Sequence, residues 1–406
     1  LSNVRYLLAQ AYAKRNDLTN AAINYREIIL AQPDLVNARI DLGYIYLIQS
    51  RFESALTHFQ QALPLLENAQ TRDAYLGEAI THQLTQDYAQ AVQSGLAAVA
   101  ADPENPLAHF VLGNIYISQK SFAEAAEHFQ QIQPFWPQSR LTAAELRNYY
   151  GAQSAVSAAY ENLGMICITQ AWVQVALEQY KTALWRTPEN PLLYYAIANA
   201  YRLRDDLENT MKNLKKALEL APDLVSIHKT MGDTYQQYQQ FENAIHAYTT
   251  YLQSNPDDAD VRIVLGLAYQ QQGKKEQAIA EYQHALEIDP ESPVALNQLA
   301  WLYAERKDQL DEALEFAQRA FEINTSPSII DTLGWVLYQR GEYASAIEHF
   351  QQALQKSPFQ PTITYHLALA HDENGDRKTA NRLFAEVLEL SKDFEEADEI
   401  RRRLAE

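Results

Sequence analysis

Prolines recur every 34 residues in the middle of this chain, at Pro188, Pro222, Pro256 and Pro290. Each interval runs through a small residue, an aromatic residue, a polar turn, an alanine, an aromatic residue, an alanine and the proline. In the repeat that ends at Pro290, these residues are Gly266, Tyr269, Ala278, Tyr282 and Ala285. A fixed period of this length predicts stacked copies of one supersecondary unit, because a single copy is too small to bury its apolar face.

Each repeat divides into two segments of helical spacing. Gly266 and Tyr269 share one face of the first segment, and Ala278 and Tyr282 share one face of the second. Gly273 lies between the segments, where glycine relieves backbone strain at a helix end. Proline then ends the second segment, because its ring and its missing N–H do not continue a helix. The repeat therefore predicts an all-α protein built from antiparallel helix pairs.

These residues and their spacing resemble the tetratricopeptide repeat, a 34-residue antiparallel helix pair. The resemblance covers almost the whole chain. It implies an α-solenoid of about eleven antiparallel helix pairs that forms a right-handed superhelix with a C-terminal cap helix. The predicted repeats start near Ser2, Val36, Arg72, Pro106, Ser157, Pro191, Val225, Ala259, Pro293, Pro327 and Pro361.

One interval breaks the period, since Pro137 and Pro188 are 51 residues apart, one repeat plus 17 residues. We therefore predict four repeats over 1–137, an inserted helix or adapter over 138–156, seven repeats over 157–393 and a cap helix over 394–406. The insert is either a packing adapter between two sub-arrays or a hinge or partner-binding knob. A smaller irregularity is one extra residue in the turn of the ninth repeat, near Asp308.

The composition excludes several classes of function. A formal net charge of −19 argues against binding to nucleic acid, which needs a basic face. No run of about 18 apolar residues occurs, so we predict no transmembrane segment in this chain. Cys167 is the single cysteine, which rules out intramolecular disulfides and multi-cysteine zinc sites. We expect it to be a buried structural thiol.

No catalytic or cofactor motif is recognisable. The sequence has ten histidines, of which His58, His128 and His349 share one repeat position that we expect to face solvent. His366 and His371 are five residues apart, so they lie on different faces of a helix and do not form a two-ligand metal site. The glycines build no phosphate-binding loop. We therefore predict a protein that is not an enzyme and that carries no metal and no cofactor.

The resemblance implies that first helices line the inner wall of the superhelix, at the second, fifth, sixth, ninth, twelfth and thirteenth positions of each repeat. Apolar and aromatic residues occupy many of these positions, and an exposed apolar surface with aromatic anchors is typical of an interface. The candidate partner-binding residues are Tyr44, Phe110, Asn114, Tyr195, Asn199, Trp301, Trp335, Tyr338 and Tyr365. The alternative for Trp301 and Trp335 is packing between neighbouring first helices. For the two asparagines, hydrogen bonding to a ligand's main chain and to water are both open.

The function that we predict is a non-catalytic scaffold that binds a peptide or a partner protein segment in this inner groove. The stretch from Trp301 to Tyr338 is similar to bacterial repeat proteins associated with exopolysaccharide export and cell-envelope assembly. That resemblance implies a periplasmic or outer-membrane-associated protein rather than a cytoplasmic one, with a lipid anchor upstream of Leu1. Because the chain opens with Leu1 rather than Met, we expect a fragment or a processed form.

Three alternatives stay open at this stage. The chain could be a self-assembling structural protein, a homo-oligomer in which the groove of one copy receives part of another. It could be the recruiting arm of an enzyme whose catalytic domain lies outside these residues. The third alternative is carbohydrate binding through the groove aromatics and asparagines.

Overall fold

The structure is a computed structural model that describes residues 2–67, 71–132, 142, 144, 146, 155–169, 171–307 and 309–405. The described part of the chain is all-helical and contains no strand. Most of the predicted insert lies outside the described residues, so the role of 138–156 and the division of the array at that point stay predictions. By its internal contacts the chain forms two compact units, unit 1 (Leu1–Thr234) and unit 2 (Tyr235–Glu406).

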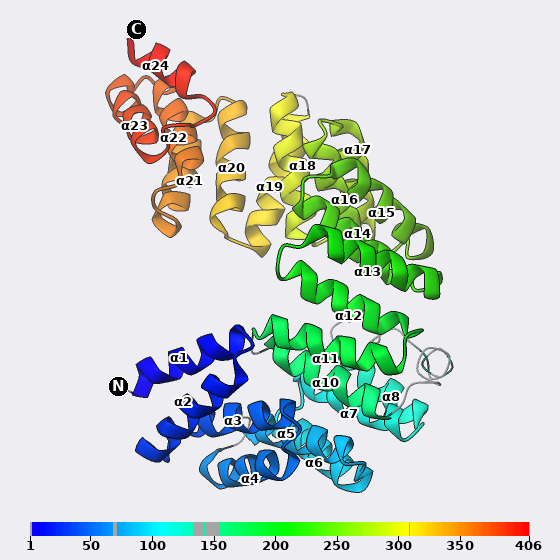
Figure 1. Ribbon diagram of the computed structural model, residues 1–406. Coiled ribbons are helices and arrows are strands. Elements are labelled where there is room, and N and C mark those ends of the chain that lie inside the picture. Colours follow the sequence, from blue (N-terminus) through cyan, green and yellow to red (C-terminus); the bar gives the residue numbers. More distant parts are fainter. Residues whose placement is uncertain are drawn as a thin grey trace. The chain divides into compact units, whose positions relative to one another are not determined.

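Unit 1 contains the helix pairs of the first six repeats and most of the first helix of the seventh (Figure 1). Its helices are α1 (Ser2–Lys14), α2 (Leu18–Ala31), α3 (Val36–Ile48), α4 (Phe52–Ala62) with the short 3-10 helix η1 (Leu63–Leu65), α5 (Arg72–Leu84), α6 (Tyr88–Ala101), α7 (Pro106–Ser118), α8 (Phe122–Phe129), α10 (Ala155–Thr169), α11 (Val173–Arg186), α12 (Pro191–Arg202), α13 (Leu207–Leu220) and α14 (Ser226–Gln237), which crosses into unit 2.

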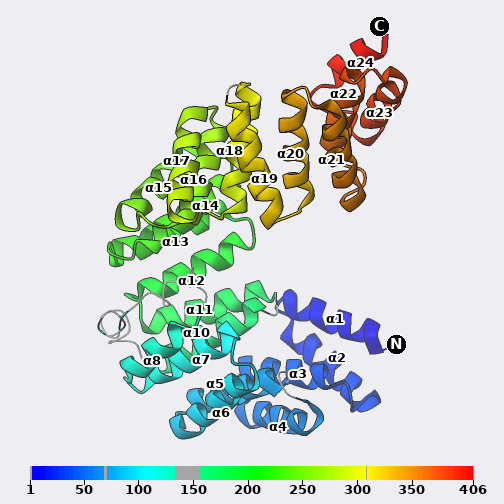
Figure 2. The ribbon, with the colours of Figure 1, turned by 180° about the vertical axis from the view of Figure 1, so that it is seen from behind.

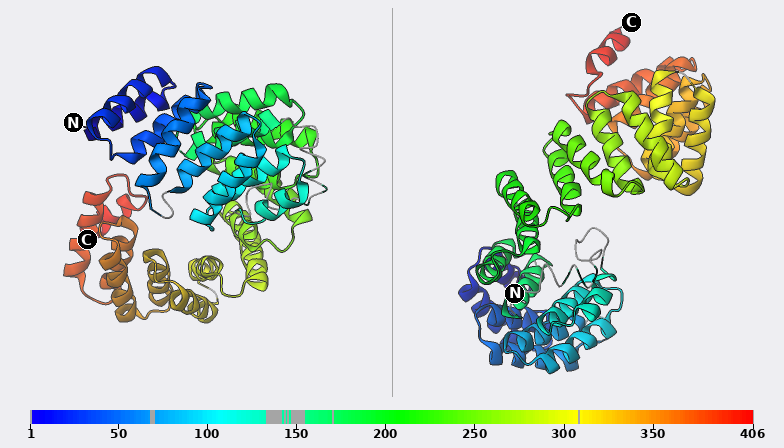
Figure 3. Two further views of the ribbon diagram at one scale, coloured as in Figure 1. Left: turned by 90° about the horizontal axis from the view of Figure 1, so that it is seen from below. Right: turned by 90° about the vertical axis from the view of Figure 1, so that its right-hand side faces the viewer.

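Unit 2 continues the same pattern, and its helices follow one another in sequence order in the views of Figure 3. They are α15 (Phe241–Ser254), α16 (Ala259–Gln271), α17 (Lys275–Ile288), α18 (Pro293–Arg306), α19 (Leu310–Ile323), α20 (Pro327–Gln339), α21 (Tyr343–Lys356), α22 (Pro361–Glu373), α23 (Arg377–Leu390) and the cap helix α24 (Ala397–Ala405). Each predicted repeat start lies within two residues of the start of an observed first helix, which confirms the predicted positions of the repeats.

Several helix pairs close where a glycine of the first helix meets an aromatic ring of the second. A Cβ atom added to Gly266 would lie 2.6 Å from Cε1 of Tyr282, and one added to Gly334 would lie 2.7 Å from Cε1 of Phe350. Both rings are fully buried. Any larger residue at these glycines would push the two helices apart, since a packed core leaves no room for extra atoms. The pattern of small and aromatic residues therefore sets the packing of these pairs.

Local signals fix the helix ends. The Asp258 side chain accepts a hydrogen bond from the Val261 N–H and caps the start of α16, as Ser292 does for Ala295 at the start of α18. Gly273 ends α16 with φ +73°, in the left-handed region that favours glycine. These ends keep the turns within each repeat short, so the helices of a pair lie antiparallel.

Candidate partner-binding surface

In unit 1, the inner side of the first helices is occupied by α10. This helix packs against α7 and also against α5, so it lies across the first helices of two preceding repeats. Ile166 and Cys167 of α10 belong to the same buried cluster as Tyr44 of α3 and Ile80 of α5. The fifth repeat therefore fills part of the inner groove in which a partner was predicted to bind.

Buried amide groups join α10 to the wall that it covers. The Asn162 side chain donates to Oε1 of Gln83 at 2.9 Å and accepts from the Asn114 amide at 3.0 Å. The Gln83 amide in turn donates to Oγ of Ser118 at 2.8 Å. Gln83, Asn114 and Asn162 are all fully buried, so each hydrogen bond is shielded from water. Gln83 and Asn114 are at predicted inner-wall positions, and their partner is this chain.

The packing of the fifth repeat against earlier repeats also brings α11 beside α1, as Figures 1 and 2 show from opposite sides. The Asn16 amide donates to both carboxylate oxygens of Glu178 at 3.0 Å. Next to this contact lies a shallow pocket. Its lining residues are Lys14, Arg15, Ala171, Val173, Gln174 and Arg204, and the Arg204 guanidinium donates to Oε1 of Gln174 at 2.7 Å. Turns of three repeats thus meet at one place in unit 1.

The structure places three of the predicted binding residues inside this packing. Tyr44 and Phe110 are 1% exposed and Asn114 is 0% exposed, so none of them offers a surface to a partner. Tyr195 is also buried, and its hydroxyl lies 3.0 Å from Oγ1 of Thr230. Asn199 alone among the unit 1 candidates is partly exposed. These four buried residues are packing residues in this structure because the chain itself covers them.

The candidates of unit 2 form one cluster of rings. We call the aromatic surface the five residues Trp301 of α18, Trp335 and Tyr338 of α20, and Tyr365 and His366 of α22. Trp301 and Trp335 stack with ring centroids 5.8 Å apart, and Trp335 stacks on Tyr338 at 5.1 Å. Trp301, Trp335 and Tyr338 stay partly exposed. Packing between neighbouring first helices and an accessible surface for a partner are therefore compatible for the two tryptophans, since their rings pack on one another and stay partly exposed.

His366 forms the floor of this surface. Its ring lies 4.5 Å from Trp335 and 5.9 Å from Trp301, and its Nδ1 is 2.8 Å from Oδ1 of Asp331. Both His366 and Asp331 are buried. The carboxylate holds the imidazole in one orientation, and the imidazole supports the two indole rings. The spacing of His366 and His371 in the sequence speaks only to a metal site; the neighbouring Tyr365 and the inner-wall position of Asp331 are the sequence signals for this structural role.

Two polar atoms at the surface are left without a partner among the described residues. The indole Nε1 of Trp335 is a buried donor, and Oδ1 of Asn297, one turn before Trp301 on α18, is a buried acceptor. Buried polar atoms in proteins are normally hydrogen-bonded, so unpaired ones point to water or a ligand.

Acidic residues border the aromatic surface at the end of α22 and before α24. Burial, followed by the nearby Glu373 carboxylate, raises the pKa of Tyr338 to about 12. Burial and then Glu396 raise the pKa of Tyr365. Arg403 acts on both tyrosines in the opposite direction, but its guanidinium is paired with Asp372 at 2.9 Å and with Glu399 at 3.0 Å.

Tyr365 lies at the edge of the aromatic surface rather than in its accessible part. Its ring meets Phe394 edge to face at 5.4 Å, and the residue is only 9% exposed. The segment that leads into α24 thus covers the last repeat on this side. Trp301, Trp335 and Tyr338 are the predicted site residues that the structure brings together on an accessible face.

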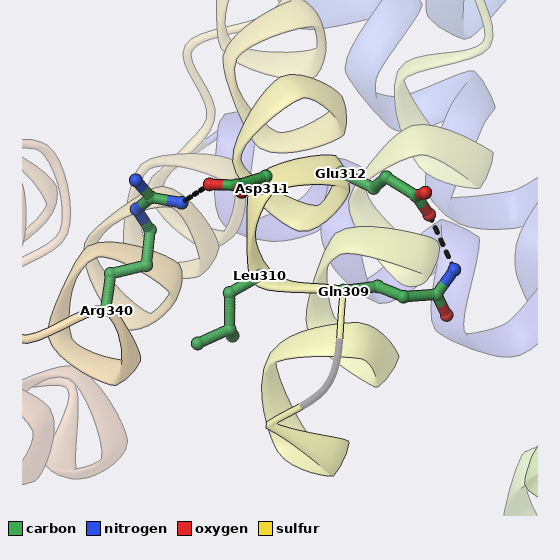
Figure 4. Close-up of a pocket in the computed structure, with 5 residues that line it drawn as sticks. All are labelled: Gln309, Leu310, Asp311, Glu312 and Arg340. Atoms are coloured by element: carbon green, nitrogen blue, oxygen red, sulfur yellow. Dashed lines mark hydrogen bonds and ion pairs between the residues drawn. The ribbon is translucent and has the colours of Figure 1, made fainter.

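A pocket at the turn between α18 and α19 is a weaker candidate. Figure 4 shows its lining of Gln309, Leu310, Asp311, Glu312 and Arg340. The Gln309 amide donates to Glu312 at 2.7 Å, and Arg340 pairs with Asp311, so the polar groups satisfy one another. The extra residue predicted for this turn does not lengthen it: residues 307–309 are three, as in the turn between α16 and α17, and α18 is instead one residue longer than α16 and α20. Lys307 and Gln309 both take left-handed conformations in the turn.

The described residues contain no group of three or more histidine, cysteine, aspartate or glutamate residues that could hold a metal ion. Cys167 is buried as predicted, and burial raises the pKa of its thiol well above the usual value. No helix in the described part of the chain has the length and apolar character that crossing a bilayer requires.

The histidines predicted to face solvent do not do so fully. His58, His128 and His349 are each partly buried against an aromatic ring, that of Tyr46, Tyr116 and Phe321 respectively. The prediction of a solvated face was therefore wrong, because the neighbouring helix reaches this position of the second helix.

Comparison with known families agrees with the repeat geometry. Family models described as tetratricopeptide repeat match residues 6–71, 76–140 and 229–293, residues 192–224, and residues 263–393. The chain belongs to the tetratricopeptide repeat family. Its repeats are those of a protein-interaction scaffold, which is the general function that this membership supports.

Solved structures with similar helices include other repeat proteins. A tetratricopeptide repeat protein from Parabacteroides merdae is 17% identical, with a TM-score of 0.49 over 62% of this chain and 99% of that one. The pilF protein of Pseudomonas aeruginosa is 21% identical, with a TM-score of 0.44 over 52% and 96%. MamA from Desulfovibrio magneticus is 22% identical, with a TM-score of 0.39 over 41% and 94%. No curated protein matches the sequence. With these scores, the likenesses add nothing to the family assignment.

Proposed function

We propose that unit 2 of this tetratricopeptide repeat protein binds an extended segment of a partner protein across the aromatic surface. The observation that carries the proposal is the partly exposed stack of Trp301, Trp335 and Tyr338. Rings held in place by His366 lose little conformational entropy on binding, which favours affinity.

The energy of such a contact is concentrated in few residues. Burial of apolar surface contributes about 25 cal/mol per Å² removed from water, and aromatic residues often account for about 2 kcal/mol or more each at the centre of an interface. We therefore expect the two tryptophans to dominate binding. Specificity would come from the few polar atoms near them.

A double variant tests this function. Peptides that bind the wild-type chain are first selected from a random library, and their affinities are then measured by fluorescence anisotropy. Trp301→Ala with Trp335→Ala is expected to weaken binding by roughly thirtyfold or more, from about 2 kcal/mol. Trp185→Ala is the matched control, since Trp185 is 81% exposed on α11 of unit 1.

The fold is monitored by circular dichroism in the same samples. Wild-type affinity in the double variant, with helicity retained, would show that partners bind elsewhere. A second copy of this chain is the alternative occupant of the surface. A molecular mass that rises with concentration in sedimentation equilibrium, and returns to the monomer value in the double variant, would identify it.

We also propose, on the sequence resemblance of the stretch from Trp301 to Tyr338, that this binding serves bacterial envelope or exopolysaccharide assembly. Fractionation of the native host into cytoplasm, periplasm and membranes tests that part by itself. Recovery of the protein in the cytoplasmic fraction alone would contradict the envelope role and leave the peptide-binding proposal standing.

A further inference from the structure

We propose that the aromatic surface selects a basic segment, in which an arginine side chain stacks on the exposed rings of Trp301, Trp335 and Tyr338 and pairs with Glu373. The inference rests on the proposed function, because it names the chemistry of the segment that the same surface binds. It concerns a partner protein that carries arginine or, with lower affinity, lysine in an otherwise apolar stretch.

The charge of the chain is concentrated in unit 2. Residues 235–406 contain 29 aspartates and glutamates against 15 lysines and arginines, a net charge of −14. Residues 1–234 contain 23 acidic against 18 basic residues, a net charge of −5. A surface of one sign attracts segments of the opposite sign and repels segments of its own. Unit 2 therefore favours a cationic partner more than unit 1 does.

The charge around the aromatic surface is also negative. Glu373, the last residue of α22, is exposed, close enough to Tyr338 to act on its hydroxyl, and has no ion pair among the described residues. Glu396, which acts on Tyr365, likewise has no ion pair in that part of the chain. Arg403 is the cation that acts on Tyr338 and Tyr365, and its guanidinium is already paired with Asp372 and Glu399. The rim thus keeps uncompensated negative charge next to the rings.

Aromatic faces strengthen this preference. The face of an indole or phenol ring is electron-rich and attracts cations, with tryptophan the strongest. Arginine suits the site better than lysine, because its planar guanidinium stacks on a ring and donates to a carboxylate at the same time. The chain already uses such contacts, since Arg51 lies 4.2 Å from the ring of Tyr46 and Arg186 lies 5.1 Å from the ring of Tyr160.

Three synthetic peptides test the inference. Each consists of three copies of a four-residue unit, Arg-Ala-Leu-Gly in the first, with glutamine replacing arginine in the second and glutamate in the third. Fluorescence anisotropy gives their affinities for the whole chain. We expect the arginine peptide to bind about tenfold more tightly than the glutamine peptide, and the glutamate peptide to bind most weakly. Raising the salt from about 50 to about 500 mM is expected to weaken only the arginine peptide strongly.

Glutamate variants locate the effect. Glu373→Gln is expected to weaken the arginine peptide about three- to fivefold and to leave the glutamine peptide unchanged. Glu348→Gln is the matched control, because it removes one exposed charge from α21, a second helix of the same unit. An equal loss with both variants would mean that net charge alone, rather than the site, attracts the peptide, and would overturn the inference.

The outcomes separate the inference from the proposed function. If the glutamine or glutamate peptide binds as tightly as the arginine peptide, and the double tryptophan variant loses that binding, the surface binds segments without regard to charge and the inference is wrong. If the arginine peptide binds the double tryptophan variant as it binds the wild type, or if no peptide binds, both the inference and the proposed function fail.

Discussion

Units 1 and 2 are built from the same repeat, yet equivalent positions differ in their exposure to solvent. Tyr44 and Trp335 both occupy the ninth position of their repeats. Tyr44 is 1% exposed and its hydroxyl donates to the carbonyl of Asp73 at 2.7 Å. Trp335 is partly exposed and its N–H has no partner among the described residues. An aromatic residue on a first helix is therefore not by itself a binding residue.

The difference comes from the path of the chain after the fourth repeat. In unit 1, α10 lies across α5 and α7 and supplies Asn162 to the buried amides of the wall. In unit 2, α18, α20 and α22 pack in order, and the rings of Trp301 and Trp335 contact each other and His366. What distinguishes the open wall of unit 2 from the filled wall of unit 1 is whether a later helix packs across the first helices.

The largest expected effect compares a filled position with an open one. Tyr44→Ala is expected to destabilise unit 1 by about 3–5 kcal/mol, because it leaves a cavity where a fully buried ring stood. Trp335→Ala is expected to cost unit 2 less, about 1–2 kcal/mol, since part of that ring already faces solvent. Differential scanning calorimetry of both variants measures the two losses. Equal losses would mean that Trp335 is a core residue, and the contrast between the units would not hold.

A second effect isolates the buried amides of unit 1. Asn162→Ala removes one partner each from Gln83 and Asn114 and leaves both groups buried, at a cost of about 2–3 kcal/mol in free energy of unfolding. Asn199→Ala is the control within the same unit, because its partly exposed amide is able to exchange protein for water, and a change below about 0.5 kcal/mol is expected. Chemical denaturation followed by circular dichroism gives both values. If Asn162→Ala were as mild as the control, α10 would not be held by these amides.

Much of this fold could be predicted from the sequence, because the period encodes it locally. Each repeat start and the meeting of Gly266 with Tyr282 depend on neighbours within about one repeat. The filling of unit 1 could not be predicted in this way. It depends on the contact of Asn162 with Gln83, 79 residues away, across an insert that breaks the period. A periodic pattern predicts each helix pair, but it does not predict where a later pair packs against earlier repeats.

The candidate site was predictable to a similar degree. Position in the repeat identified Trp301, Trp335 and Tyr338, and the structure brings these three together. The same rule also selected Tyr44, Phe110 and Asn114, because it treats each repeat as if nothing covered it. The support from His366 and Asp331 was missed, since it joins two different positions in successive repeats.

The smallest effect compares two histidines at one repeat position. Burial, and then Arg39, Arg26 and Arg51, lower the pKa of His58 in unit 1 to about 4. Burial lowers the pKa of His349 in unit 2, but there Glu348 and Gln352 act in the opposite direction. Surroundings of opposite charge thus distinguish the units at this position as well.

The sign of the pH effect follows from the direction of these shifts. An unfolded histidine has its pKa near 6.5, so the folded state binds its proton less readily, and the stability that neutral His58 contributes is present above pH 6.5 and lost as the pH falls towards 4. Because the ring is only partly buried, we expect a loss of about 1 kcal/mol between pH 7 and 5. Asp41, whose pKa burial raises to about 6, acts in the other direction, since its contribution is present at low pH and lost as the pH rises through 6.

Comparison with His58→Gln removes the contribution of Asp41, which is common to both proteins. The free energy of unfolding of unit 1 is expected to fall by about 1 kcal/mol more in the wild type than in His58→Gln over this pH range. His349→Gln is expected to change the pH dependence of unit 2 by less, because Glu348 favours the protonated ring. Parallel curves for the wild type and His58→Gln would show that neither burial nor the nearby arginines lower the pKa of His58, and the contrast between the two units would then not extend to their second helices.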